Sequence, residues 1–148
     1  DPQGAVFGLW QPGAHIGARA GQAPGTLCWS ELATSDAAGA QAFYTGLFGW
    51  EATRSNLPGV DYTIFQAAGS AAGGMLQMTA EWQGAPPHWM PYFLVADCDA
   101  IAGRAEAAGG KVCVPPTDIP TVGRFAVLND GQGAYFSIIR LQEAPATA

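Results

Sequence analysis

Two stretches of this chain can be superposed without a gap, and this internal repeat restricts the fold more than any other feature of the sequence. The superposition places Asp36 on Asp97. It also places Gly49 on Gly110. In each stretch the Asp can cap the start of a helix, and the Gly can end that helix. The repeat therefore predicts that one strand-helix order occurs twice.

The first half of the repeat is predicted to contain one strand, one helix and three more strands. Residues 26–34, TLCWSELAT, have the length and mixed apolar-polar pattern of a strand. Strand-like runs also occupy residues 51–54, 62–68 and 74–78, between turn-forming sequences. The helix is indicated by apolar residues at the spacing of one helix face, namely Ala40, Phe43, Tyr44, Leu47 and Phe48.

The second half follows the same order. Residues 90–97, MPYFLVAD, are predicted to form a strand, and residues 98–110 a helix of small side chains. Three strands are expected at residues 111–116, 123–130 and 133–141, the last two joined by a tight glycine-containing turn. The domain is therefore predicted to be α+β and to contain two βαβββ units.

Composition excludes several classes of function. The net charge is −6 and Lys111 is the only lysine, so the chain has no basic stripe for a nucleic acid backbone. Three cysteines without a CxxC pair favour reduced thiols over disulfides or a zinc knuckle. No apolar run reaches the roughly 18 residues of a membrane span. We expect a cytoplasmic protein that binds neither nucleic acid nor membrane.

Three motifs together resemble one known family. They are WSELATSDAAGAQAFYTGLFGWE, HWMPYFLVADCDAIAGRAEAAGGKV and GRFAVLNDGQGAYFSII. Over residues 26–142 the chain resembles the vicinal oxygen chelate superfamily of glyoxalases, bleomycin-resistance proteins and extradiol dioxygenases. It is most similar to a tandem-domain, glyoxalase-like branch often labelled hydroxylase. The resemblance implies curved mixed sheets around a cup, in which a metal is held by side chains from the first and last strands of each unit.

The chain begins and ends with related sequences. DPQGAVFGLWQ at residues 1–11 shares five of eleven positions with DGQGAYFSIIR at residues 130–140. The resemblance to tandem-domain proteins implies that residues 1–11 are an extra strand, either the last strand of a preceding domain or a swapped strand; a chance likeness is the alternative. Residues 12–25, rich in Gly, Ala and Pro, are predicted to be a linker, and residues 143–148 a disordered tail.

The expected metal ligands are missing from this sequence. The first-strand ligand position of the family maps onto Trp29 in one unit and Met90 in the other. The last-strand position maps onto Ser137 in the second unit, and near Met75 or Gln77 in the first. Indole and thioether groups do not bind hard divalent ions. We therefore expect no metal and no cofactor, with a divalent metal as the alternative.

Other side chains could still supply polar groups to the cup. Strand alternation puts Glu31 on the same face as the lost ligand, with Tyr92 as its counterpart in the second unit. Glu31 is either a hydrogen-bond acceptor or base, or a carboxylate paired with Arg124 or a backbone donor. His15 and His88 lie in separate loops, which makes a poor metal site, so we expect them to be solvent-facing or capping residues.

What remains is an aromatic cup with few polar groups, the usual composition of a small-molecule pocket. The alternative is that the rings simply fill the core. Trp89 is expected nearby. The predicted ligand-binding residues are Trp29, Glu31, Met90, Tyr92, Arg124, Phe125, Tyr135 and Ser137.

Three functions are compatible with these residues. The first is a metal-free domain that captures an aromatic or hydrophobic small molecule, as in drug or antibiotic sequestration. The second is a glyoxalase-like lyase or an oxygenase, for which the sequence identifies no catalytic residue. The third is a degenerate half that packs against a domain of the same fold. A homodimer, or pairing with such a domain, is expected in addition to the small-molecule ligand.

Overall fold

The computed structural model describes residues 1–17, 21–55 and 59–142. Backbone contacts divide the described chain into two compact units. Unit 1 comprises residues 1–17, 29–55 and 59–90, and unit 2 comprises residues 21–28 and 91–142. Each unit contributes the predicted order of strand, helix and three strands, which confirms the α+β fold of two βαβββ units.

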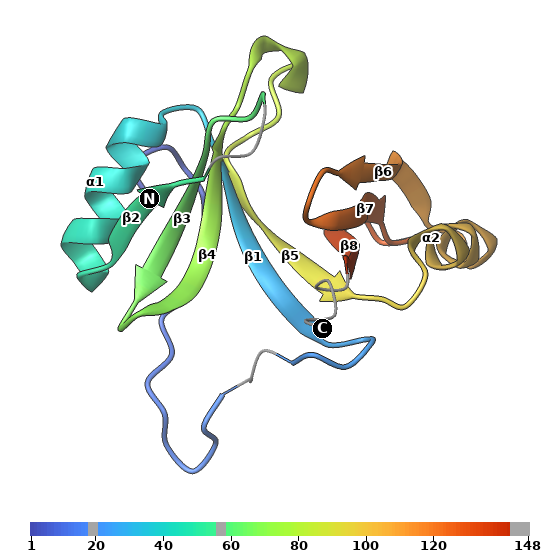
Figure 1. Ribbon diagram of the computed structural model, residues 1–148, viewed down its shortest axis with the longest axis horizontal. Coiled ribbons are helices and arrows are strands. Elements are labelled where there is room, and N and C mark those ends of the chain that lie inside the picture. The colour runs from blue at the N-terminus through green and yellow to red at the C-terminus, as the bar shows by residue number, and fades with distance from the viewer. Residues whose placement is uncertain (18–20, 56–58, 143–148) are drawn as a thin grey trace, which may run out of the picture. The chain divides into compact units, whose positions relative to one another are not determined.

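Unit 1 contains a mixed sheet with one helix across one of its faces (Figure 1). The strands are ordered β2-β3-β4-β1; β1 runs parallel to β4, and the other neighbours are antiparallel. A short 3-10 turn, Ala80–Trp82, follows the last strand. The elements are β1 (Leu27–Thr34), α1 (Ala37–Phe48), β2 (Glu51–Arg54), β3 (Tyr62–Ala67) and β4 (Ser70–Gln77).

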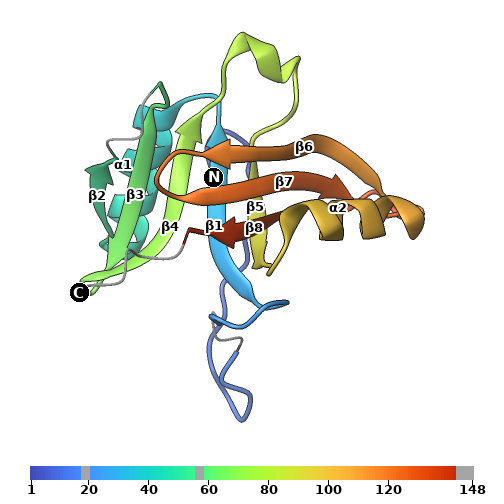
Figure 2. The ribbon, with the colours of Figure 1, turned by 45° about the vertical axis from the view of Figure 1, so that its right-hand side comes forward.

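Unit 2 repeats this arrangement in the order β5-β8-β7-β6, with β5 parallel to β8 and the other neighbours antiparallel. Its helix runs alongside β6 and β7 (Figure 2). The elements are β5 (His88–Leu94), α2 (Cys98–Ala107), β6 (Lys111–Ile119), β7 (Gly123–Asn129) and β8 (Tyr135–Leu141).

Both helices begin as the repeat predicts. Asp36 accepts a hydrogen bond from the Gly39 amide at 3.0 Å, and Asp97 accepts one from the Ala100 amide at 2.9 Å. Each carboxylate satisfies an amide that has no partner within its helix. Gly49 ends α1 with a φ of 67°, a left-handed conformation that suits glycine.

Each unit buries its core between the helix and the facing side of its sheet. In unit 1 the fully buried large side chains there are Leu32, Tyr44, Phe65 and Met75. In unit 2 the buried set is Val95, Cys98, Ala102, Ala126, Leu128 and Ile138. Since successive residues of a strand point to opposite faces, these sets identify which side chains lie on the face away from the helix.

Three strands extend beyond their predicted ranges. β5 begins at His88, two residues before the expected start. β4 begins at Ser70, four residues before the expected start, because its small residues hide the apolar alternation on which the prediction relied. β6 continues through Pro115 and Pro116 to Ile119. Proline is tolerated there because β6 is at the end of the strand order of its unit, where a missing amide costs no ladder hydrogen bond on the open side.

The repeated motif forms the same turn at both of its positions. In each copy the Asp side chain accepts hydrogen bonds from the backbone amides two and four residues further on. The distances are 3.1 and 2.8 Å at Asp1, and 2.8 and 2.9 Å at Asp130. A glycine with a φ of 100° follows in both copies, Gly4 and Gly133. The sequence similarity between residues 1–11 and 130–140 therefore corresponds to a shared turn conformation at the start of each segment.

Residues 1–11 contain no strand in this structure. Their pairing with a preceding domain or a second copy stays a prediction. Ala5 is fully buried, and the ring of Phe7 contacts the rings of Phe43, Tyr44 and Phe48 at centroid distances of 6.2, 5.5 and 6.0 Å. The segment thus packs Ala5 and Phe7 against the α1 side of unit 1 and joins no ladder. Gly8, at the place of Ser137 in the other copy, also favours irregular backbone.

The remaining connections carry no regular structure. Residues 12–17 and 21–25, in the predicted linker, contain neither helix nor strand. The predicted tail, residues 143–148, lies outside the described residues. Among the described residues no helix is long and apolar enough to cross a membrane.

Candidate functional site

Three side chains of unit 1 form a hydrogen-bonded group on the sheet face opposite α1, which we call the cup face of unit 1. Trp29 and Glu31 lie on one face of β1, as predicted, and the buried Leu32 lies on the opposite face. The indole Nε1 of Trp29 donates to the Tyr62 hydroxyl at 2.8 Å. Tyr62 is hydrogen-bonded in turn to Glu31. All three residues are partly exposed, so a ligand can approach them.

Gly74 makes room for this group. It pairs with Glu31 on β1 and with Ile64 on β3, so it lies in the middle of the sheet beneath the three side chains. A Cβ atom built on Gly74 would overlap the hydroxyl and ring of Tyr62. Tyr62 therefore fills the space that any other residue at position 74 would need.

The environment of Tyr62 keeps its hydroxyl protonated. Burial, and next the charge of Glu31, raise the pKa of Tyr62 well above its ordinary value. A neutral hydroxyl donates its hydrogen to the carboxylate and accepts the indole hydrogen with its oxygen. The group is thus a directed chain of hydrogen bonds from Trp29 through Tyr62 to Glu31.

The structure also fixes the register that the sequence left open. In unit 2 Ser137 pairs with Tyr92, and the counterpart of Tyr92 in unit 1 is Glu31, which pairs with Gly74. The last-strand ligand position of unit 1 is therefore Gly74, and not Met75, which is buried in the core beside α1. This glycine-rich strand has no apolar alternation from which the register could be predicted.

Gln77, the other candidate for that position, supports the helix instead. Its Oε1 accepts a hydrogen bond from the Ala37 amide at 2.8 Å. Its Nε2 donates to the Ser35 and Met78 carbonyl oxygens at 2.9 and 3.1 Å. Gln77 thus ties the end of β4 to the start of α1.

In unit 2 the sheet face away from α2 carries four of the predicted ligand-binding residues. Tyr92 and Ser137 lie there side by side, and Phe125 pairs with Ile139 on the same face. Ser137 is fully buried, and its Oγ has no hydrogen-bond partner among the described residues. Tyr135 is 59% exposed at the start of β8. Met90, the counterpart of Trp29, is buried in β5.

Arg124 does not belong to this face. It lies on the α2 side of β7, where its guanidinium bonds Asp99 at 2.7 and 2.9 Å and Asp118 at 3.0 Å. The hydrogen bond from Arg124 lowers the pKa of Asp99. The positive charge therefore joins α2 to β6, and the expected pairing of Glu31 is made by Tyr62 and not by Arg124.

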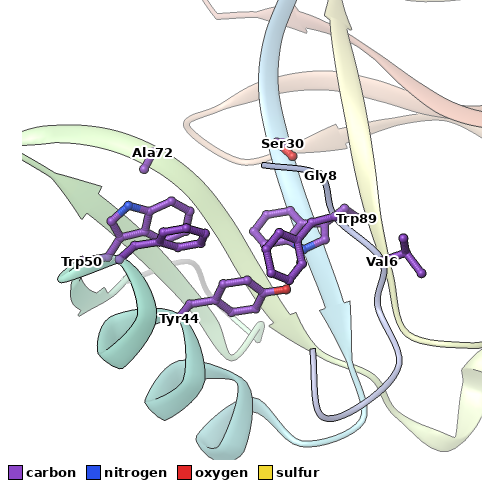
Figure 3. A pocket seen from close by; sticks show the side chains of 9 residues that line it. Val6, Gly8, Ser30, Tyr44, Trp50, Ala72 and Trp89 are labelled. Atoms are coloured by element: carbon purple, nitrogen blue, oxygen red, sulfur yellow. The ribbon is translucent and has the colours of Figure 1, made fainter. Parts of the chain in front are cut away.

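Trp89 was expected near the aromatic cup, but it lies on the α1 side of the unit 1 sheet. Its Nε1 donates to the Tyr44 hydroxyl at 2.8 Å, on the α1 side of unit 1. Figure 3 shows Tyr44 pointing toward Trp89 in a cavity of about 300 Å³. The cavity is lined by Val6, Phe7, Gly8, Ser30, Tyr44, Phe48, Trp50, Ala72 and Trp89. It is separate from the cup face, because Ser30 and Glu31 point to opposite sides of β1.

The described residues do not fit a metal ion. They contain no group of three or more His, Cys, Asp or Glu side chains that could hold one. His88 Nδ1 lies 2.8 Å from the carbonyl oxygen of Pro86, and His15 Nδ1 accepts from the Gly17 amide. Each histidine bonds a backbone group two residues away along the chain. A hard divalent ion needs several anionic or imidazole donors at one point, and the cup face of unit 1 offers one carboxylate.

Tyr62 is the residue that the sequence did not identify. It lies 31 residues after Glu31 on a separate strand, so no local pattern joins the two. The adjacent glycines Gly73 and Gly74 were the available signal, because glycine inside a strand often marks close approach of another group.

The amino-acid sequence matches one family model and several curated proteins. The sequence model of the Glyoxalase/Bleomycin resistance protein/Dioxygenase superfamily matches residues 26–138. A putative glyoxylase, CFP32, of Mycobacterium tuberculosis is 45% identical over 141 residues, which are 95% of this chain and 53% of that protein. The anthracycline biosynthesis protein DnrV of Streptomyces peucetius is 36% identical over 149 residues, covering 100% of this chain and 54% of that protein.

This chain thus spans about half the length of the curated relatives it matches. Solved structures share the fold at lower identity. A hypothetical protein from Bacillus halodurans has a TM-score of 0.62 at 15% identity, over 82% of this chain and 98% of that one. A methylmalonyl-CoA epimerase from Mycobacterium tuberculosis has a TM-score of 0.57 at 16% identity, over 88% and 97%.

Proposed function

We start from the fact that this chain belongs to the glyoxalase, bleomycin-resistance protein and dioxygenase superfamily, and we propose that it is a small-molecule-binding domain. It captures a planar aromatic or hydrophobic molecule on the cup face of unit 1 and uses no metal to do so. Sequestration of a drug or antibiotic is one use of such a domain.

The observation that carries this proposal is the hydrogen-bonded group of Trp29, Tyr62 and Glu31. At the two positions where the family resemblance implies metal ligands, unit 1 has Trp29 and Gly74. The Tyr62 side chain occupies the space over that glycine. An aromatic surface with one oriented carboxylate favours stacking and hydrogen bonding of a flat organic molecule over chelation of a metal.

The relatives support an aromatic ligand. The proteins DauV and DnrV are named for anthracycline biosynthesis, and they match this chain over its whole length. Anthracyclines are flat, fused-ring molecules of the shape that an indole face can stack against. We extend this ligand class to the present chain as part of the proposal.

The test is a titration of an anthracycline into the purified chain, followed by tryptophan fluorescence and by calorimetry. Stacking on Trp29 should quench its emission, and Trp29→Ala should weaken binding by about 1–3 kcal/mol. Trp10→Ala is the matched control, because Trp10 is 65% exposed and lies outside the cup face. Unchanged affinity in a folded Trp29→Ala protein would refute the proposed site.

A second candidate function rests on Glu31. A carboxylate held beside a neutral Tyr62 hydroxyl can accept a proton from a bound substrate, and the mycobacterial relatives are named as putative glyoxylases. Under this alternative, the chain should turn over a substrate in a glyoxalase assay, and Glu31→Gln should abolish turnover without loss of the fold. Turnover that depends on Glu31 would favour the lyase over the binding domain.

A further inference from the structure

The cavity on the α1 side of unit 1 lies on the opposite side of the sheet from the cup face. Its volume is about 300 Å³, and the nine described residues that line it carry no charge. An apolar cavity of about 150 Å³ is large enough to bind benzene. This cavity therefore has the volume for a molecule of two fused rings.

The wall of the cavity is mainly aromatic, with the buried Tyr44 at its centre (Figure 3). The ring of Tyr44 is stacked on that of Trp50 at a centroid distance of 6.0 Å, and it meets Trp89 edge-on at 5.4 Å. The ring of Phe48 lies 4.8 Å from that of Trp50. Ring faces and edges arranged in this way favour a flat aromatic ligand.

The polar hydrogens at the centre of the wall are used within the protein. Trp89 Nε1 donates to the Tyr44 hydroxyl at 2.8 Å, and this hydroxyl donates to Asp1 Oδ2 at 3.0 Å. The Ser30 hydroxyl makes no hydrogen bond with the described residues, so it can pair with a polar atom of a ligand. A charged ligand would find no group of opposite charge in this wall.

Two features of β4 open this space. A β-bulge interrupts its pairing with β3, which passes from Gly73 directly to Ala71. A bulge turns a side chain away from strict alternation, and here it places Ala72 in the cavity wall. A Cβ atom on Gly73 would lie 3.0 Å from the Ser30 carbonyl oxygen and 3.4 Å from the Trp89 ring. Glycine at this position therefore lets the indole approach the sheet.

The N-terminal segment completes the wall with residues 6–8. The carboxylate of Asp1 holds this segment in place without lining the cavity itself. Its Oδ1 accepts hydrogen bonds from the amides of Gln3 and Ala5 at 3.1 and 2.8 Å. Its Oδ2 accepts the one from Tyr44, on α1. Asp1 thus joins the turn of the segment to the helix.

We propose that this cavity is a binding site separate from the cup face, that it takes a small uncharged molecule of two fused aromatic rings, and that the N-terminal segment closes it. The site does not depend on the proposed function of the cup face. The two can therefore be tested separately.

The probe for this site is 5-fluoroindole, followed by fluorine nuclear magnetic resonance at neutral pH, and the chain should bind it. The charge requirement is tested with 5-fluoroindole-2-carboxylate and with the amide of the same shape. The carboxylate should bind at least about tenfold more weakly than the amide, because it loses water without gaining a cationic partner. A carboxylate that binds as tightly as the amide would overturn the uncharged ligand class.

The location is tested by Ala72→Leu, which fills the cavity and should abolish binding of 5-fluoroindole. Ala71→Leu is the matched control, because it adds the same side chain at an exposed position that does not line the cavity. It should leave the affinity unchanged. Nuclear Overhauser effects from the probe to the Ala72 methyl group and the Trp89 ring locate the probe in the unmodified chain, whether or not Ala72→Leu folds. Effects at neither residue would refute the site.

Closure by the N-terminal segment is tested by Asp1→Ala, which releases the segment without changing a residue of the wall. The affinity for 5-fluoroindole should fall by about threefold to tenfold, because it scales with the fraction of molecules in which the segment is docked. Asp130→Ala, which removes the equivalent turn carboxylate of unit 2, is the control and should leave the affinity unchanged. Equal affinities of Asp1→Ala and the unmodified chain would show that the segment does not close the site.

The outcomes separate this site from the cup face. Binding of 5-fluoroindole that is lost in Trp29→Ala and kept in Ala72→Leu would assign the probe to the cup face and overturn the cavity site. No binding of 5-fluoroindole by the unmodified chain would also overturn the cavity site. Binding of an anthracycline, lost in Trp29→Ala and kept in Ala72→Leu, would support the cup face in either case.

Discussion

Tyr62 shows how one side chain can occupy the space left by a missing one. Its hydroxyl lies over Gly74 and joins Trp29 to Glu31, although Tyr62 is on β3 and the other two residues are on β1. Burial and the neighbouring carboxylate disfavour the phenolate form, so the pKa of Tyr62 is raised. The raised pKa of Tyr62 can be measured by titration.

In an alkaline titration followed by phenolate absorbance, Tyr62 should remain protonated above the pH at which a free phenol ionises. In the unfolded chain Tyr62 ionises near pH 10, whereas the folded state holds its proton, so the folded state loses stability as the pH rises above about 10. Tyr62→Phe should reduce this loss. Ionisation of Tyr62 near pH 10 in the folded protein would contradict the buried geometry.

Gly74→Ala tests the steric relation between Gly74 and Tyr62. The added methyl group would overlap Tyr62, so the side chain has to move, and the free energy of unfolding should fall by about 1–3 kcal/mol. Gly46→Ala is the control, because no atom lies within 4 Å of the Cβ that it adds and the site is helical; it should be neutral or stabilising by up to about 1 kcal/mol. Equal denaturation midpoints for Gly74→Ala and the unmodified chain would refute the overlap.

At the scale of elements, the two helices are specified by local signals that repeat along the chain. Asp36 and Asp97 cap α1 and α2 in the same way, each through the amide three residues further on. The helix starts and the strand order could be predicted from the sequence because these signals act within a few residues of one another.

Asp36→Ala and Asp97→Ala should each lower the free energy of unfolding by about 0.5–2 kcal/mol, because an amide at the helix start loses its acceptor. Ser35→Ala, next to the cap of α1, should change it by less than about 0.5 kcal/mol. Chemical denaturation followed by circular dichroism measures all three variants. If Ser35→Ala costs more than Asp36→Ala, the cap has been assigned to the wrong residue.

Features that depend on distant partners could not be predicted in this way. The register of β4 is set by its pairing with β1 and β3, and its small side chains leave no alternation in the sequence. The position of Arg124 depends on two carboxylates in α2 and β6. The face assignments of Trp29 and Tyr92 could be predicted, because alternation within one strand determines them.

At the scale of the whole molecule, the N-terminal segment, residues 1–11, has one side packed against the protein and one side exposed. Its inner side chains, Ala5 and Phe7, are held against α1. Its outer side chains Val6, Leu9 and Trp10 are 87%, 75% and 65% exposed. Exposed apolar side chains in a row are typical of a surface that contacts another protein.

The expected pairing with a second copy or with another domain of the same fold remains a prediction. The exposed side of the N-terminal segment, with Val6, Leu9 and Trp10, is the surface that we expect to make this contact. Replacing Val6, Leu9 and Trp10 together by Ser should shift the protein toward monomer in light scattering, while Phe7 keeps the segment docked. Unfolding should occur at the same denaturant concentration. A chain that is monomeric before substitution, or a dimer that persists after it, would show that this surface does not mediate association.

The overlap between Gly74 and the Tyr62 hydroxyl also restricts how this domain can evolve. A His or Glu introduced at position 74, where the family resemblance implies a metal ligand, would collide with Tyr62. A smaller side chain at position 62 has to come first, and that change by itself dismantles the hydrogen bonds to Trp29 and Glu31. The two positions are therefore coupled, and no single substitution at position 74 adds a side chain there without displacing Tyr62.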